Sequence, residues 1–262
     1  MSDVEQYAPG TPSWVDVSSP DPDAAAAFYS GLFGWTAGEP GSIEETGGYR
    51  MFELRGRVVA GLGPMQPNVP VPVWTTYITV ADAEQACAAA REAGGLVFLE
   101  PMDVLTAGRM AVIADPQGAV FSVWQPLDRI GCEIVNEPGA LAWNELATRD
   151  TGAASAFYGA VFGWTAEASP AGPVDYTTWM LGGAPVGGMM AMDENYPPGV
   201  PPNWLVYVGV EDCAAACGLA TELGGAVQMG PMTIAAGTFA VLSDPFGAVF
   251  AVIALSEERL AA

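Results

Sequence analysis

FYSGLFGW (residues 28–35) occurs again, almost unchanged, as FYGAVFGW at residues 157–164 of this 262-residue chain. The two octets start 129 positions apart (28 to 157), which is about half the length of the chain. A repeat with this period predicts that one structural unit is encoded twice. We therefore expect two homologous domains, residues 1–130 and residues 131–262, each long enough to form its own core.

Other motifs recur around the octets in the same order. Trp14 and Asp16 in the first half correspond to Trp143 and Glu145 in the second half. An Asp-Pro-x-Gly-Ala-Val-Phe motif is present at residues 115–121 and again at residues 244–250. Because the order of the motifs is conserved between the halves, the same succession of helices and strands is expected in both.

The apolar pattern of each half predicts a strand, a helix and further strands, followed by the same arrangement once more. Alternation places Trp14 and Asp16 on one face of the first strand, and Thr75 and Tyr77 on one face of a later strand. The helices are expected at residues 24–33 and 82–93, with Gly34 ending the first of them. The other expected strands of the first half are 49–54, 57–62, 96–99, 110–114 and 119–125.

The charge of the chain is strongly acidic. There are 30 Asp and Glu residues against eight basic residues, all of them Arg, and the net charge is −22. Such a charge repels nucleic acids and anionic membranes, so we expect neither as a partner, and it attracts small cations. No apolar run is long enough to span a membrane, and the first residues do not resemble a signal peptide, so a cytoplasmic location is expected.

The four cysteines predict no metal site. Cys213 and Cys217 are one helical turn apart, but the chain has no His and no further Cys near them to complete a zinc site. We interpret them, together with Cys87 and Cys132, as small buried apolar residues of a reducing compartment.

The repeated octet, the Asp that precedes its helix and the Asp-Pro-x-Gly hairpin resemble the vicinal-oxygen-chelate superfamily. This superfamily contains glyoxalase I, extradiol dioxygenases, fosfomycin-resistance enzymes and bleomycin-binding proteins. The resemblance covers nearly the whole chain, because both halves carry the motifs. It implies an α+β fold in which four βαβββ modules form two tandem domains with curved mixed sheets around clefts.

Metal-dependent members of that superfamily use His and Glu ligands at three positions of each domain. Counted from the shared motifs, these positions are occupied here by Trp14, Thr75 and Ser122, and by Trp143, Leu205 and Ala251. None is a ligand of the family, so we expect no metal and no cofactor. A site for Mg²⁺ or Ca²⁺ built only from carboxylates that are distant in sequence remains an alternative.

Other catalytic sites are restricted by the same composition. Without His or Lys, the chain contains no Ser-His or Cys-His pair and no lysine to form a Schiff base. The carboxylates of Asp16 and Glu145 are the remaining candidates for a general base. The alternative is that both are structural carboxylates of their strands, hydrogen-bonded to neighbouring backbone groups or to Arg.

The remaining candidates for ligand recognition are mainly aromatic, and flat aromatic rings with flexible Met side chains suit an apolar ligand. Our candidate ligand-binding residues are Trp14, Thr75, Tyr77, Ser122, Trp124, Trp143, Leu205 and Tyr207. Trp74, Trp179 and Trp204 belong to the same aromatic set, of which a part must form the core. Two Pro-rich loops, residues 64–72 and 196–202, are candidates for the rims of the clefts.

Three hypotheses about function follow. The preferred one is a metal-independent protein that binds a hydrophobic or aromatic, cationic small molecule, for sequestration or self-resistance as in the bleomycin-binding branch. The second is a cofactor-free lyase, isomerase or oxygenase-like enzyme of secondary metabolism, with Asp16 or Glu145 as general base. The third is an interaction protein whose clefts no longer bind ligands. The sequence leaves open whether the chain is a monomer or a homodimer.

Overall fold

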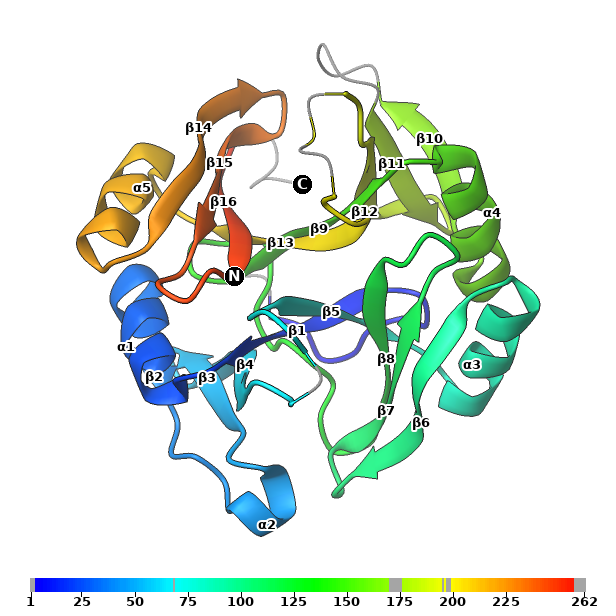
Figure 1. Ribbon diagram of the computed structural model, residues 1–262, viewed down its shortest axis with the longest axis horizontal. Coiled ribbons are helices and arrows are strands. Elements are labelled where there is room, and N and C mark those ends of the chain that lie inside the picture. The colour runs from blue at the N-terminus through cyan, green and yellow to red at the C-terminus, as the bar shows by residue number, and fades with distance from the viewer. Residues whose placement is uncertain (1–2, 68, 170–175, 195, 197–198, 257–262) are drawn as a thin grey trace.

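The computed structural model describes residues 3–67, 69–169, 176–194, 196 and 199–256. Among these residues, the strands form two eight-stranded mixed sheets, one from each half of the chain (Figure 1). The first sheet contains β1 (Pro12–Ser19), β2 (Thr36–Ala37), β3 (Arg50–Leu54), β4 (Arg57–Pro64), β5 (Trp74–Thr79), β6 (Leu96–Val104), β7 (Gly108–Ala114) and β8 (Val120–Pro126). The second contains β9 (Leu141–Thr148), β10 (Thr165–Ser169), β11 (Tyr176–Leu181), β12 (Ala184–Ala191), β13 (Asn203–Gly209), β14 (Ala226–Ile234), β15 (Gly237–Ser243) and β16 (Val249–Leu255). The helices are α1 (Pro22–Phe33), α2 (Ile43–Thr46), α3 (Ala83–Glu92), α4 (Thr151–Phe162) and α5 (Cys213–Glu222).

Each sheet is made of two βαβββ modules joined at its centre. The strand order is β2-β3-β4-β1-β5-β8-β7-β6 in the first sheet and β10-β11-β12-β9-β13-β16-β15-β14 in the second. The modules meet at the antiparallel pairs β1–β5 and β9–β13. The predicted α+β class and the four modules are therefore confirmed.

The structure differs from the sequence-based expectation at two places. Strand β6 continues to Val104, whereas we expected it to end at Leu99, because two bulges against β7 let the strand pass Pro101 without losing its pairing. The short elements β2 and α2 were not predicted. Elements of two to four residues are too short to leave a periodic pattern in the sequence.

The ends of the long helices lie close to the expected residues: α1 ends at Phe33 as expected but begins at Pro22, two residues before the expected start. The side chain of Asp21 accepts a hydrogen bond from the backbone N–H of Ala24 at 3.0 Å, and Asp150 caps α4 in the same way through Ala153. Gly34 follows α1 with a φ of 70°, a left-handed conformation that glycine adopts without strain. Both ends of the repeated helix are therefore set by local chemistry.

The two domains pack back to back, and the repeated octet forms much of the contact between them. The Tyr29 hydroxyl donates to Asp244 Oδ2 of the second domain at 3.1 Å and accepts from Trp74 Nε1 at 3.0 Å. Reciprocally, Tyr158 of the second octet donates to Asp115 Oδ2 of the first domain at 3.3 Å. Each octet thus contacts the Asp-Pro-x-Gly hairpin of the other domain.

The other aromatic residues of the octets cross the boundary as well. Trp35 Nε1 donates to the carbonyl of Gly139, just before the second sheet, at 2.6 Å. Trp164 Nε1 donates to the carbonyl of Gly10, just before the first sheet, at 2.7 Å. The ring of Phe28 lies against Gly225, where a Cβ atom would come within 2.9 Å of the ring. The helices and hairpins of both domains therefore form a shared aromatic core.

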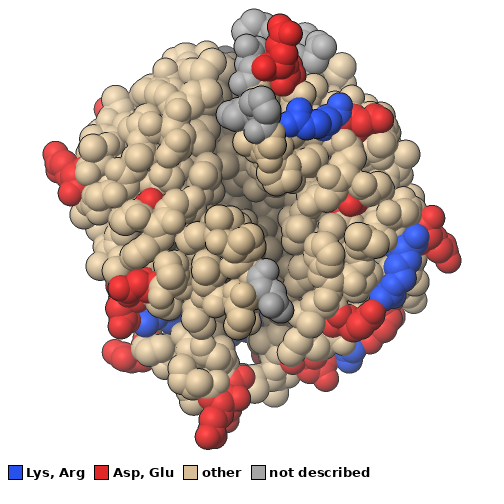
Figure 2. Space-filling view, in the orientation of Figure 1, with Lys and Arg blue, Asp and Glu red and all other residues tan. Residues whose placement is uncertain are grey.

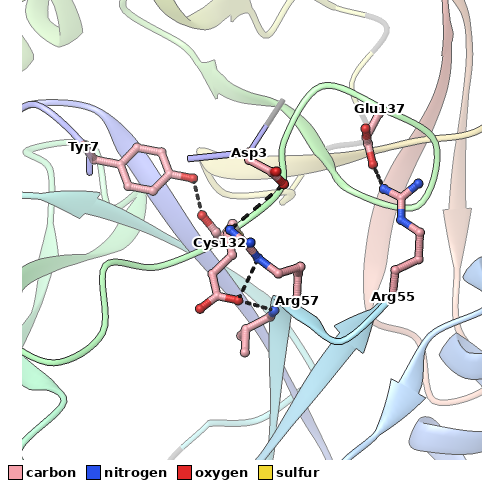
Figure 3. Close-up of polar contacts among 8 residues, drawn as sticks. Asp3, Tyr7, Arg55, Arg57, Cys132 and Glu137 are labelled. Atoms are coloured by element: carbon pink, nitrogen blue, oxygen red, sulfur yellow. Dashed lines mark hydrogen bonds and ion pairs between the residues drawn. The ribbon is translucent and has the colours of Figure 1, made fainter. Parts of the chain in front are cut away.

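The segment that connects the domains is held against the β3–β4 hairpin (Figure 3). Arg55 forms an ion pair with Glu137, and Arg57 Nε lies 3.4 Å from a carboxylate oxygen of Glu133. The Tyr7 hydroxyl donates to the carbonyl of Cys132 at 2.6 Å. These contacts tie the connection to the first domain.

All four cysteines are buried and carry free thiols, as we expected. Burial raises the pKa of the Cys213 thiol to about 11, which keeps it protonated at neutral pH. In the part of the chain that the structure describes, no helix is both long enough and apolar enough to cross a bilayer.

We predict that Tyr29→Phe destabilises the fold by about 2 to 4 kcal/mol, because it leaves the Trp74 indole N–H and the Asp244 carboxylate with one buried partner fewer. Urea denaturation followed by tryptophan fluorescence measures the effect. Tyr158→Phe, the equivalent change in the second domain, should have a similar cost. A loss below about 0.5 kcal/mol in both variants would contradict the role given to these hydroxyls.

Candidate functional site

The concave face of the first sheet is the side that carries Asp16, opposite the side packed on the helices and the second domain. In the register of β1 and β5, Trp14 lies opposite Tyr77, and Asp16 lies opposite Thr75. Tyr77 in turn lies beside Ser122 of β8. Because paired residues on neighbouring strands point to the same side, these five predicted site residues share one face. Trp124, two residues after Ser122, joins them.

The Asp16 carboxylate is held by two tyrosines. Its Oδ2 atom accepts hydrogen bonds from Tyr77 at 2.8 Å and from Tyr49 at 3.0 Å, and the Thr75 side chain contributes another. Trp14 Nε1 donates to the Tyr49 hydroxyl at 3.1 Å, so the indole orients one of the two tyrosines. Tyr49, which was not among the predicted site residues, precedes β3 and reaches Asp16 across β4.

Burial changes the acidity of this group. It raises the pKa of Asp16 to about 6, although the hydrogen bonds from Tyr77, Tyr49 and Thr75 act in the opposite direction. Burial, and then the nearby Asp16 charge, hold the pKa of Tyr49 and Tyr77 well above the ordinary value for tyrosine. At pH 7 the carboxylate is therefore mostly ionised, and both phenols remain donors.

The second domain contains the same arrangement around Glu145. Glu145 Oε1 accepts from the Tyr207 hydroxyl at 3.0 Å, and Tyr176 forms a further hydrogen bond with the carboxylate. Trp143 Nε1 donates to the Tyr176 hydroxyl at 2.8 Å. Leu205, predicted as a site residue, lies opposite Glu145 in the register of β9 and β13. Burial raises the pKa of Glu145 as well.

Two glycines make room for the tyrosines that reach across the sheet. Gly61 lies beside Asp16, and Gly188 lies beside Glu145. A Cβ atom at Gly61 would be 1.8 Å from the Tyr49 hydroxyl, and one at Gly188 would be 1.8 Å from the Tyr176 hydroxyl. Any other residue at these positions would displace the tyrosine, so the carboxylate network depends on both glycines.

Methionines from the outer strands extend each concave face. In the first sheet Met102 pairs with Met110, which pairs with Trp124, and Met102 is 46% exposed. In the second sheet Met232 pairs with Phe239 and is 44% exposed. Large exposed apolar side chains on a concave surface are typical of ligand-binding sites. Met102 was not among the predicted site residues, because its strand was expected to end at Leu99.

Three aromatic residues of the predicted set lie elsewhere. Trp74 and Trp204 donate to Tyr29 and Tyr158 in the core between the domains, and Trp179 is completely buried there. They sit on the other face of their strands and cannot contact a ligand on the concave face.

The concave faces do not offer the ligands that a divalent metal of the family would need. The family's metal positions do converge, since Trp14, Thr75 and Ser122 lie on adjacent strands, but an indole and two hydroxyls replace His and Glu. Leu205 and Ala251 at the corresponding places of the second sheet have no donor atom. Within the described ranges, no three His, Cys, Asp or Glu residues gather in a way that could hold a metal ion.

The raised pKa of Asp16 gives a prediction about stability. Its folded pKa of about 6 lies above the ordinary value of 3.8, so its contribution to stability is complete below about pH 4 and is lost as the pH rises through 6. Between pH 4.5 and pH 7.5, we expect the free energy of unfolding of Asp16→Asn to rise by about 2 kcal/mol relative to that of the unmodified protein. Urea denaturation of both proteins at the two pH values measures this change. If the two proteins differ in stability by the same amount at both pH values, the pKa of Asp16 is not raised.

A model of the Glyoxalase/Bleomycin resistance protein/Dioxygenase superfamily matches residues 11–123 and 140–252. The putative glyoxylase CFP32 of Mycobacterium tuberculosis is 42% identical over 258 residues, which cover 97% of this chain and 98% of the relative. The anthracycline biosynthesis protein DnrV of Streptomyces peucetius is 39% identical over 271 residues, covering 97% of this chain and 96% of DnrV.

Solved structures show the same fold at low sequence identity. The Mn(II)-bound glyoxalase of Novosphingobium aromaticivorans superposes with a TM-score of 0.64 and 18% identity, over 97% of this chain and 83% of that one. The 2,3-dioxygenase LapB of Pseudomonas sp. KL28 gives a TM-score of 0.64 and 14% identity, over 97% and 93% of the two chains. With two matched repeats and full-length relatives, this chain belongs to the Glyoxalase/Bleomycin resistance protein/Dioxygenase superfamily.

Proposed function

We propose that this protein binds a flat, cationic aromatic molecule, without a metal, on the concave face that carries Asp16. The observation that carries the proposal is a partly exposed carboxylate, mostly ionised at pH 7, on a sheet face that also carries aromatic and Met side chains. A carboxylate in such a place attracts a cation, while the apolar surface around it favours the rings of the same ligand.

The distribution of charge supports a cationic ligand. The net charge of −22 draws cations toward the protein. In the view of Figure 2 most charged side chains lie around the periphery of the molecule. The overall charge would therefore concentrate the ligand, and the concave face would recognise it.

The relatives support an aromatic ligand. DnrV is named as a protein of anthracycline biosynthesis and is similar over nearly its whole length. Anthracyclines are flat fused-ring compounds, and many of them carry an amino sugar that is protonated at neutral pH. A role in secondary metabolism, through sequestration of such a compound, fits both this similarity and the concave face.

We predict that daunorubicin, an anthracycline with an amino sugar, binds saturably and quenches tryptophan fluorescence, and that its sugar-free aglycone binds more weakly. Asp16→Asn should weaken daunorubicin binding about 10- to 100-fold, because it removes the charged partner of the amine. Its effect on the aglycone should be small. Isothermal titration calorimetry measures both affinities.

The matched control for the loss of one negative charge is Glu92→Gln, an exposed position at the end of α3. It should leave the Kd for daunorubicin within about twofold, because an exposed charge far from the ligand contributes little. Equal weakening by both variants would show that only the overall charge attracts the ligand. If neither compound binds saturably, the binding proposal is wrong.

A second candidate function is catalysis with Asp16 as a general base. The specific observation in its favour is the pKa of about 6, which is close to the range where a carboxylate removes protons efficiently at neutral pH. The similarity to CFP32, named a putative glyoxylase, points in the same direction.

The enzyme hypothesis predicts that the bound compound is chemically changed. The protein is incubated with daunorubicin and the mixture is analysed by mass spectrometry. A product should then appear, and the rate of its formation should rise with pH through about 6. Asp16→Asn should abolish that product while the fold is retained. Recovery of every bound compound unchanged favours the binding protein.

A further inference from the structure

The two concave faces differ in how far their carboxylates are exposed. Asp16 is partly exposed, whereas Glu145 is buried and only 7% exposed. The aromatic partners show the opposite trend, since Trp14 is buried and Trp143 is partly exposed. A cation arriving from solvent can therefore approach the first carboxylate more closely than the second.

The residues beside the carboxylates also differ. Thr75 lies opposite Asp16, and Leu205 takes the same place opposite Glu145. Ser122 lies beside Tyr77, and Ala251 takes the same place beside Tyr207. The first face therefore has two hydroxyl groups, of Thr75 beside Asp16 and of the buried Ser122 beside Tyr77, where the second face has hydrocarbon.

A tyrosine from the loop between β12 and β13 lies near the second carboxylate. The Tyr196 backbone N–H bonds to the carbonyl of Asp193 at 3.2 Å, in the same type of turn that joins Val69 to Gln66 at 3.0 Å in the first domain. Burial, followed by the charge of Glu145, raises the pKa of the half-buried Tyr196 to about 12. Tyr196 also raises the pKa of Tyr207, so the phenol of Tyr196 lies near both Glu145 and Tyr207. Val69 is too small to cover Asp16 in this way.

Among the described residues, the loop of the second domain has a contact that has no counterpart in the first domain. Arg149 Nη2 donates to the carbonyl of Val200 at 3.1 Å. Arg149 stands just before the helix cap Asp150, where the first domain has Pro20 before Asp21, and proline has no side chain that could make this bond. The loop of the second domain is therefore attached to the start of α4. Residues 68, 195, 197 and 198 of the two loops lie outside the described residues.

We propose that each chain has one cation-binding face, that of Asp16, and that Tyr196, Leu205 and Ala251 close the second face to the same ligand. This inference rests on the proposed function. In this arrangement Glu145 serves to hold Tyr207 and Tyr176 in place, and the specificity of the chain is set by three residues that distinguish its two halves.

The test exchanges these three residues for those of the first domain. Isothermal titration calorimetry of the full chain with daunorubicin should give one site per chain. The variant Tyr196→Val/Leu205→Thr/Ala251→Ser should give two sites, and Asp16→Asn in that background should leave one. A matched control, Val69→Tyr in the first domain, should weaken the single site of the unmodified protein at least tenfold.

A second measurement keeps the test valid if the triple variant fails to fold. In hydrogen–deuterium exchange of the unmodified protein, daunorubicin should protect β1, β5 and the loop between β4 and β5. It should give no protection of β9 and β13. Two sites of similar affinity in the unmodified protein, or equal protection of both sheets, would overturn the inference and leave the proposed function standing. Absence of any binding would overturn both.

Discussion

Tyr29 and Tyr158 each extend a hydroxyl across the boundary between the domains to an aspartate at the turn of the opposite hairpin, and the rest of the structure depends on this exchange. The same hydroxyls accept from Trp74 and Trp204, which brings the central strands β5 and β13 into the same network. Because the partners are buried, each of these bonds is costly to leave unmade. The helices of one domain are therefore held against the strands of the other, and the convex sides of both sheets are covered.

Covering the convex sides leaves the concave sides free for recognition. On each of them a single carboxylate would be unstable in an apolar environment without partners, and two tyrosine hydroxyls supply them. One of these tyrosines reaches the carboxylate only because Gly61 or Gly188 has no side chain. The chemistry of each face thus follows from a constraint on backbone space as much as from the carboxylate itself.

Much of this organisation could be predicted from the sequence, because the relevant patterns are local. Alternation along a strand placed Trp14 with Asp16 and Thr75 with Tyr77, and the capping residues located the helices. Tyr49 could not be predicted, since its contact with Asp16 depends on the pairing of β3, β4 and β1 in space. The contact of Tyr29 with Asp244 spans 215 residues, and neither residue carries a local sign of its partner. The octet indicated the family but not its role between the domains.

The reciprocal contacts make the two halves of this chain resemble the subunits of a symmetric dimer, joined by the covalent connection at residues 127–140. In a dimer of identical subunits, every substitution appears twice, and both clefts must change together. Joining the halves in one chain removes that restriction and also makes their association independent of protein concentration. One half can then carry Leu205, Ala251 and Tyr196 while the other carries Thr75, Ser122 and Val69, an asymmetry that a dimer of identical subunits cannot have.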